Sequence, residues 1–189
     1  IIVVDGGPPP LSRYKMPGHA STLALVMSDG DQPLFVNCGG GGGCGSIGAE
    51  LARLLRTSAA HSTLTLNDRN STGLLNNGGF GRGVTAVELH RPESDEATSL
   101  ALSHDGYVKS FGLVHHRFVQ LLANGKQVNG RDWLEQAGKK TPPGVDFTIR
   151  FHLAPWVEAA LTADNRGAWL QLPNGIIWQF KANWGLRLE

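Results

Sequence analysis

Short runs in which apolar and polar residues alternate are spread along most of the chain. The clearest covers 62–67, and His61 stands directly before it. A period of two is typical of a strand with one buried face. Upstream, the runs 20–27 and 33–37 are separated by turn residues at 28–31, and this order predicts an antiparallel hairpin.

The second half of the chain repeats this pattern. Turn signals such as Asn124-Gly125 separate further strand-like runs. These runs are 84–91, 97–103, 111–123, 126–129, 146–153, 157–163, 168–172, 175–182 and 184–189. One more run, 1–5, lies at the start of the chain. Many short strands with frequent turns predict an all-β, antiparallel β-sandwich. We expect the five tryptophans, among them Trp169, Trp178 and Trp184, to fill its core.

Helical spacing is rare. Leu51, Leu54 and Leu55 have the i, i+3, i+4 spacing of one helix face and predict a short helix at about 48–55, directly after a glycine-rich loop. A second helix is possible at 131–137. No internal repeat is visible, and we expect residues 1–189 to form one domain.

One motif indicates a different fold. Gly43-Cys-Gly45-Ser-Ile-Gly48 reads G-x-G-x-x-G, and Asp68 follows 20 residues later, as in dinucleotide-binding proteins. The helix after it is too short for a crossover between parallel strands, and no further βαβ unit follows. We therefore interpret the segment as a glycine-rich loop rather than a cofactor site.

Composition excludes two classes of partner. A net charge of +1 gives no field that would attract nucleic acid, and no apolar run approaches the ~20 residues that span a membrane. Cys38 and Cys44 could close a small disulfide loop or remain thiols. The chain starts at Ile1 without Met and ends at Glu189 in a strand-like run, so we expect it to be part of a longer protein.

Three polar side chains mark the ends of the early strands. If these strands lie side by side, His19, Asn37 and His61 converge from points far apart in the sequence. Such a group would suit a metal ion or a polar group of a substrate.

Six stretches in order carry a resemblance to a known family. They are Gly18-His-Ala-Ser, Phe35-Val-Asn-Cys-Gly39, Arg56-Thr-Ser-Ala-Ala-His-Ser-Thr-Leu64, Ser103-His-Asp-Gly-Tyr107, Gly112-Leu-Val-His-His-Arg117 and Phe147-Thr-Ile-Arg-Phe-His-Leu153. Together they resemble the C-terminal domain of heparinase II/III-like proteins. The resemblance covers about 18–189.

The resemblance implies a supersandwich-like β-domain that follows an N-terminal α/α toroid, which this chain lacks. Such proteins are polysaccharide lyases, which cleave uronic-acid-containing glycans by β-elimination. A base removes the C5 proton of the uronate while donors neutralise its carboxylate. The family's catalytic tyrosine lies in the toroid, so Tyr107 is not expected to take that role. The sandwich supplies a catalytic histidine, often the first of an H-x-H pair, and here Pro17 stands at that position and His19 at the second. The resemblance therefore implies either that His19 takes the catalytic role or that the protein lacks this histidine.

The resemblance also implies a site for zinc or another divalent metal at His19, Asn37 and His61. Asn37 stands where the family has aspartate, so a hydrogen-bond network is the alternative. His115, His116 and Arg117 could bind an acidic polysaccharide, or lie on a solvated strand face, with His115 and His116 on opposite faces.

The partners implied are the acidic polysaccharide and the toroid, in a periplasmic or secreted protein. The alternative function is a non-catalytic carbohydrate-binding or structural sandwich, and the isolated domain should be inactive in either case.

Overall fold

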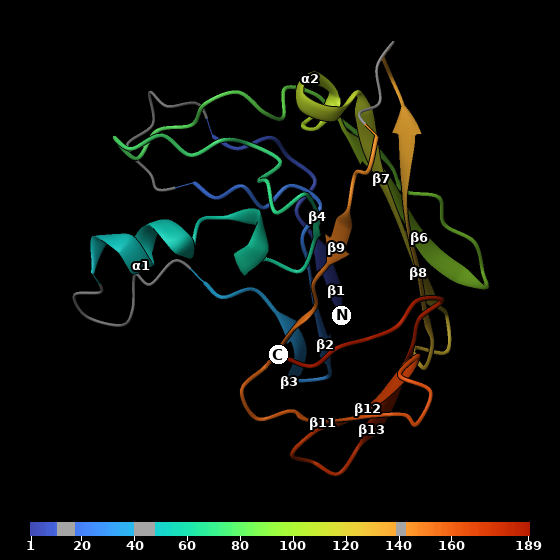
Figure 1. The fold of residues 1–189 in the computed structure, drawn as a ribbon. Coiled ribbons are helices and arrows are strands. Elements are labelled where there is room, and N and C mark those ends of the chain that lie inside the picture. The colour runs from blue at the N-terminus through green and yellow to red at the C-terminus, as the bar shows by residue number, and fades with distance from the viewer. Residues whose placement is uncertain (11–17, 40–47, 139–142) are drawn as a thin grey trace.

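The computed structural model describes residues 1–10, 18–39, 48–138 and 143–189. Within them the chain is mostly β, every strand pair is antiparallel, and two short α-helices are present (Figure 1). The predicted all-β, antiparallel class is confirmed. So is the helix after the glycine-rich loop, which is α1 (Ala49–Leu54).

The first sheet contains the predicted hairpin. Its order is β1-β2-β3-β10, with bounds β1 (Ile2–Val4), β2 (Leu25–Asp29), β3 (Gln32–Val36) and β10 (His152–Leu153). β2 begins at Leu25 rather than at residue 20, because the chain before it turns sharply. Leu23 has a φ of +63°, a left-handed conformation that costs a non-glycine residue about 1–2 kcal/mol. Its backbone N–H donates to the Asp5 carbonyl at 2.9 Å.

The second sheet contains the longest strands. Its order is β5-β6-β7-β8, with bounds β5 (Val87–His90), β6 (Ala97–His104), β7 (Leu113–Leu122) and β8 (Val128–Gln136). The prediction of a possible helix at 131–137 is wrong, because most of that segment lies in β8. Residues 128–136 pair with β7, and Asp132 lies opposite Arg117. Pairing with a long neighbouring strand outweighs the weak helical pattern.

Two smaller sheets complete the structure. β4 (Leu64–Leu66) pairs with β9 (Phe147–Ile149), and β11 (Glu158–Leu161), β12 (Gly167–Gln171) and β13 (Ile177–Lys181) form a three-stranded sheet. β4 is buried on both faces rather than one, since even Thr65 is enclosed. The run 184–189, expected to be a strand, forms none.

The short helical segments lie at turns. The 3₁₀ turn η1 (Ser58–Ala60) precedes His61, and α2 (Val108–Phe111) lies between β6 and β7. α2 ends at Gly112, whose φ of +68° is the left-handed conformation that glycine adopts without strain. No helix of the described residues is long and apolar enough to span a bilayer.

The main core joins three sheets. Its buried residues are Leu25, Met27, Leu34, Phe35, Val119, Ala168, Leu170 and Leu172, from or directly beside β2, β3, β7 and β12. The prediction for the tryptophans is wrong for three of five: Trp156, Trp169 and Trp184 are 49%, 48% and 71% exposed. Trp178 is half-buried against the core and donates its indole N–H to Asp29 at 3.0 Å.

Most of the G-x-G-x-x-G motif lies outside the described residues, which resume at Gly48. Among the described strands none forms a parallel pair. A dinucleotide fold requires such pairs around each crossover helix, so the interpretation of the motif as a loop agrees with the fold.

Candidate functional site

Two histidines far apart in the sequence meet beside the first sheet. His19 precedes β2 and His61 follows η1, and the Ala20 N–H donates to the Arg56 carbonyl to hold the two segments together. His19 Nδ1 lies 3.0 Å from His61 Nε2, and the rings are almost perpendicular. His61 is buried and His19 half-buried. The structure therefore brings together two of the three residues expected to converge.

A backbone carbonyl determines the tautomers of this pair. His61 Nδ1 lies 2.7 Å from the carbonyl oxygen of Thr57, which can only accept. The neutral His61 ring therefore carries its hydrogen on Nδ1 and accepts at Nε2. His19 must then donate from Nδ1, so its Nε2 holds the lone pair.

Both rings are held neutral by their surroundings. Burial lowers the pKa of His19, and the guanidinium of Arg56 lowers it further, while Asp5 and the Leu55 carbonyl oppose these effects in part. Burial also lowers the pKa of His61, against the opposing effect of its Thr57 hydrogen bond. A neutral imidazole with a free nitrogen can remove a proton from carbon.

The third expected ligand, Asn37, is engaged with the backbone. Its Oδ1 accepts the Ser62 N–H at 2.8 Å. The histidine pair supplies two suitable nitrogens, and the Thr57 carbonyl orients His61 as in many metal sites. However, no group of three or more His, Cys, Asp or Glu side chains in the described part of the chain could hold a metal. The residues present do not complete a zinc site, so the metal remains a prediction.

His152 also lies close to these segments. Its Nε2 donates to the Ala59 carbonyl at 2.9 Å, and its Nδ1 faces the Cys38 sulfur at 3.5 Å. Cys38 is exposed on the surface, and the partial burial of its thiol raises the pKa of that group, which disfavours the reactive thiolate. His152 thus ties β10 to η1. Cys44, the other cysteine, lies outside the described residues.

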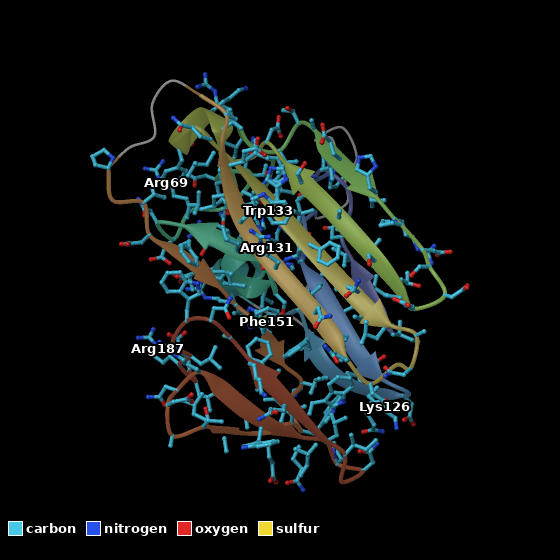
Figure 2. All side chains as sticks on the ribbon, turned by 90° about the vertical axis from the view of Figure 1, so that its right-hand side faces the viewer. Arg69, Lys126, Arg131, Trp133, Phe151 and Arg187 are labelled. Carbon is cyan, nitrogen blue, oxygen red and sulfur yellow. The ribbon has the colours of Figure 1, made fainter. Side chains whose placement is uncertain are left out.

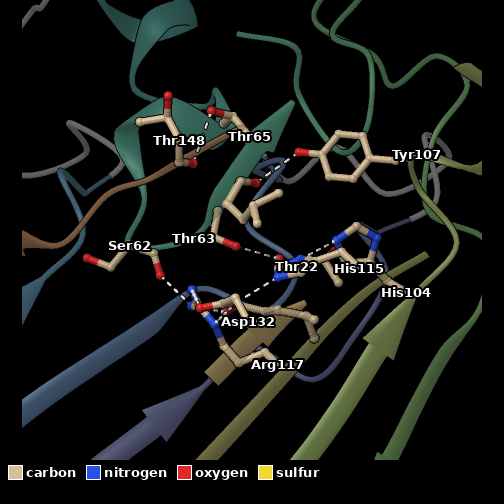
Figure 3. Close-up of polar contacts among 12 residues, drawn as sticks. Thr22, Ser62, Thr63, Thr65, His104, Tyr107, His115, Arg117, Asp132 and Thr148 are labelled. Atoms are coloured by element: carbon tan, nitrogen blue, oxygen red, sulfur yellow. Dashed lines mark hydrogen bonds and ion pairs between the residues drawn. The ribbon is translucent and has the colours of Figure 1, made fainter. Parts of the chain in front are cut away.

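The group expected to bind polysaccharide divides between two faces of β7. His115 and Arg117 point inward and are 0% and 1% exposed (Figure 3). Arg117 donates to both Asp132 carboxylate oxygens, at 2.8 and 3.1 Å, and to the carbonyls of Leu23 and Ser62. Because these side chains are buried, the expected groove of His115, His116 and Arg117 is not present on the surface of this domain.

A directed hydrogen-bond chain completes this buried network. His104 Nδ1 accepts the Gly106 N–H at 3.0 Å, so His104 Nε2–H donates to His115 Nδ1 at 3.2 Å. His115 Nε2–H then donates to Asp132 at 2.7 Å. Burial lowers the pKa of His104 to about 3 and also lowers that of His115, while Arg117 contributes to lowering the pKa of Asp132 to about 2. The network binds the second sheet to the loops before β2 and β4.

Asp132 and His104 were missed as network members by the sequence reasoning. The pairing of Asp132 with Arg117 follows only if 131–137 is a strand beside β7, because the strand register places the two residues opposite each other. The prediction of a possible helix in that segment excluded this pairing. Tyr107 is also internal: its hydroxyl donates to the Leu64 carbonyl at 2.9 Å, and burial raises its pKa. Tyr107 is thus a buried residue that ties the turn after β6 to β4.

His116 lies on the outer face of β7. Its ring stacks on Trp133 with centroids 4.8 Å apart. The guanidinium of Arg131 lies 5.3 Å from the centre of the same Trp133 ring. Figure 2 shows Arg131 and Trp133 beside each other on the side of β8 that faces the viewer. His116 Nε2 is 2.8 Å from a Glu135 carboxylate oxygen, an ion-pair distance without the angle of a hydrogen bond.

The fold and the histidine pair agree with a family assignment. The family model for the heparinase II/III-like C-terminal domain matches residues 1–189. The chain therefore belongs to the heparinase II/III-like family, as the resemblance of its six sequence stretches indicated. This family includes polysaccharide lyases.

Among characterised proteins, the chain is similar to FtsZ-localized protein C of Caulobacter vibrioides (strain NA1000 / CB15N). The two are 27% identical over 192 aligned residues, which cover 94% of this chain and 32% of the relative. The chain thus spans about a third of that protein's length. No solved structure matches the chain significantly.

Proposed function

We propose that this chain is the C-terminal domain of a polysaccharide lyase that cleaves uronic-acid-containing glycans by β-elimination. One observation carries the proposal: the Thr57–His61–His19 chain leaves an unprotonated Nε2 on a half-buried histidine. Membership of the heparinase II/III-like family supports the reaction class.

In this mechanism His19 is the base. Its Nε2 takes the C5 proton of the uronate, and the electron pair released forms the C4–C5 double bond as the C4–O bond breaks. His61 fixes the ring by accepting from Nδ1, and it disperses the positive charge that develops on His19. The burial and the Arg56 charge that lower the pKa of His19 keep this base neutral near pH 7. An N-terminal domain would supply the acid for the leaving oxygen.

The test uses the full-length protein with alginate and heparan sulfate as substrates. Formation of the unsaturated uronate is followed by its ultraviolet absorbance. We expect His19→Ala to reduce kcat at least ~100-fold, the usual contribution of a general base. The pKa of His19 is lowered from the ordinary histidine value of 6.5, so His19 takes up a proton only below that pH. The rate should therefore fall at pH values below 6.5.

Two further variants sharpen this test. His61→Ala should lower kcat with little effect on KM and alter the acidic limb of the pH profile, because His61 positions His19 without touching substrate. His90→Ala, on an exposed strand residue, should leave the rate unchanged. Absence of turnover on any uronate polymer would overturn the proposal.

A second candidate is a non-catalytic domain of a protein that localises with FtsZ. The similarity to FtsZ-localized protein C favours it, as does Pro17 at the family's first histidine position. A fluorescent fusion of the full-length protein that colocalises with FtsZ, combined with no lyase activity, would support this candidate over the first.

A further inference from the structure

A cavity of about 520 Å³ lies beside the loop that follows β4. It is an open cavity lined by residues from the loop 68–82 and from α2, and Arg69, Asn70, Arg82 and Ser110 contribute to its lining. Leu74 is among the apolar residues of its wall. None of these residues takes part in the histidine pair or in the buried network.

The lining carries more hydrogen-bond donors than acceptors. Within the described part of the chain, the side chains of Arg69, Arg82 and Ser110 make no hydrogen bond or ion pair with another side chain or with the backbone. Asn70 uses its Oδ1 to accept the Ser58 N–H at 2.9 Å, which leaves its amide hydrogens available. Asp68 supplies a carboxylate to the lining, and this carboxylate lies 3.6 Å from the guanidinium of Arg150, a residue that does not line the cavity.

Charge is concentrated in this part of the sequence. Residues 51–87 contain four arginines and a single acidic residue, Asp68, although the whole chain has a net charge of only +1. The rest of the chain therefore has a net negative charge. An anion approaching this side of the molecule meets a local positive field.

The loop that forms part of the cavity wall also contacts the chain segment before His19. Phe80, from the loop that forms the cavity wall, packs so closely on Gly18 that a Cβ added there would lie 2.8 Å from its ring. On the same ring lies the guanidinium of Arg56, 5.3 Å from its centre. His19 directly follows Gly18, so the same loop contacts the histidine segment through Phe80 and lines the cavity through its other residues.

We propose that this cavity binds the carboxylate or sulfate group of an acidic sugar, with Arg69 and Arg82 as its cationic contacts. Guanidinium groups bind planar oxyanions with two parallel hydrogen bonds, and the apolar wall suits the face of a sugar ring. The choice of a glycan rests on the proposed function, whereas the preference for an oxyanion rests on the cavity lining alone.

The experiment measures binding to the full-length protein by calorimetry, with His19→Ala as background so that no turnover occurs. The probes are an alginate hexasaccharide, the same hexasaccharide with its carboxyl groups reduced to alcohols, and a sulfated heparin hexasaccharide. We expect the carboxyl-reduced probe to bind at least tenfold more weakly than the alginate probe. A preference for the heparin probe over alginate would identify sulfate as the favoured group.

Arg69→Gln and Arg82→Gln should each weaken binding of the charged probes about tenfold, the usual effect of losing one charge-assisted contact. Arg166→Gln, which removes an exposed arginine at a distant turn, should not change it. Equal binding by wild type and both variants, or no binding of either charged probe, would overturn the inference. Arginine-dependent binding without lyase activity would instead retain this site and reject the proposed reaction.

Discussion

The carbonyl oxygen of Thr57 can only accept a hydrogen bond, and this restriction passes through His61 to His19. Because His61 donates from Nδ1, its Nε2 must accept, and His19 must present its own Nε2 unprotonated. A single backbone group thus selects the form of histidine that acts as a base. The sequence contains both histidines but not their ring orientation.

Asn37 permits a direct test of the metal prediction. Asn37→Asp would add a carboxylate to two histidine nitrogens, and carboxylate is a far better zinc ligand than an amide. We expect the variant to bind Zn²⁺ at least ~10-fold more tightly than wild type, measured by competition with a chromophoric chelator.

The replacement conserves the hydrogen bond from the Ser62 N–H, since an aspartate oxygen also accepts. Combining it with His61→Ala should remove the gain. Equal zinc affinity in wild type and Asn37→Asp would show that residue 37 does not act with the histidine pair.

At the scale of elements, β7 places consecutive residues in opposite surroundings. His115 and Arg117 enter the buried network, while His116 stacks on Trp133 outside it. Arg117 binds Asp132 on β8 and the carbonyl of the left-handed Leu23 before β2. It thereby joins the second sheet to the turn that precedes β2.

We expect Arg117→Met to lower the free energy of unfolding by about 3–5 kcal/mol, because it leaves the Asp132 carboxylate buried without its cation. Chemical denaturation of the isolated domain measures this loss. Adding Asp132→Asn should restore part of it by removing the unpaired charge.

His116→Ala on the same strand is the matched control and should cost about 1 kcal/mol or less, the value of one aromatic contact. A loss from Arg117→Met no larger than that of the control would show that the ion pair contributes little to stability.

At the scale of the whole molecule, the buried histidines make stability depend on pH. The unfolded chain protonates His104 near pH 6.5, whereas burial keeps it neutral in the fold down to about pH 3. The free energy of unfolding should therefore fall as pH decreases through this window. The loss from His104 alone should reach about 2 kcal/mol at pH 5.

Denaturation midpoints of the domain between pH 7 and pH 5 measure this slope. His104→Asn keeps an acceptor for the Gly106 N–H but does not titrate, so it should flatten the dependence. His90→Asn, at an exposed position, should leave it unchanged. A slope in His104→Asn as steep as in wild type would assign the effect to other groups.

The strand pattern was predictable where one face is buried and the other is exposed. The runs in β6, β7 and β12 were predicted to within two residues at each end, because alternation records the two faces directly. It failed at 20–24, where hydrogen bonds to other segments hold an irregular turn, and at 184–189, where no strand pairs with the run.

The sequence by itself determined the class of fold and the family, because periodicity and six ordered stretches are properties of the chain. It also named His19 and His61. Only the tertiary structure decided which histidines are accessible, since burial of His115 and Arg117 depends on strands distant in sequence. It also decided the tautomer of His19 and the position of the arginine-lined cavity, because contacts between segments far apart in the chain create both.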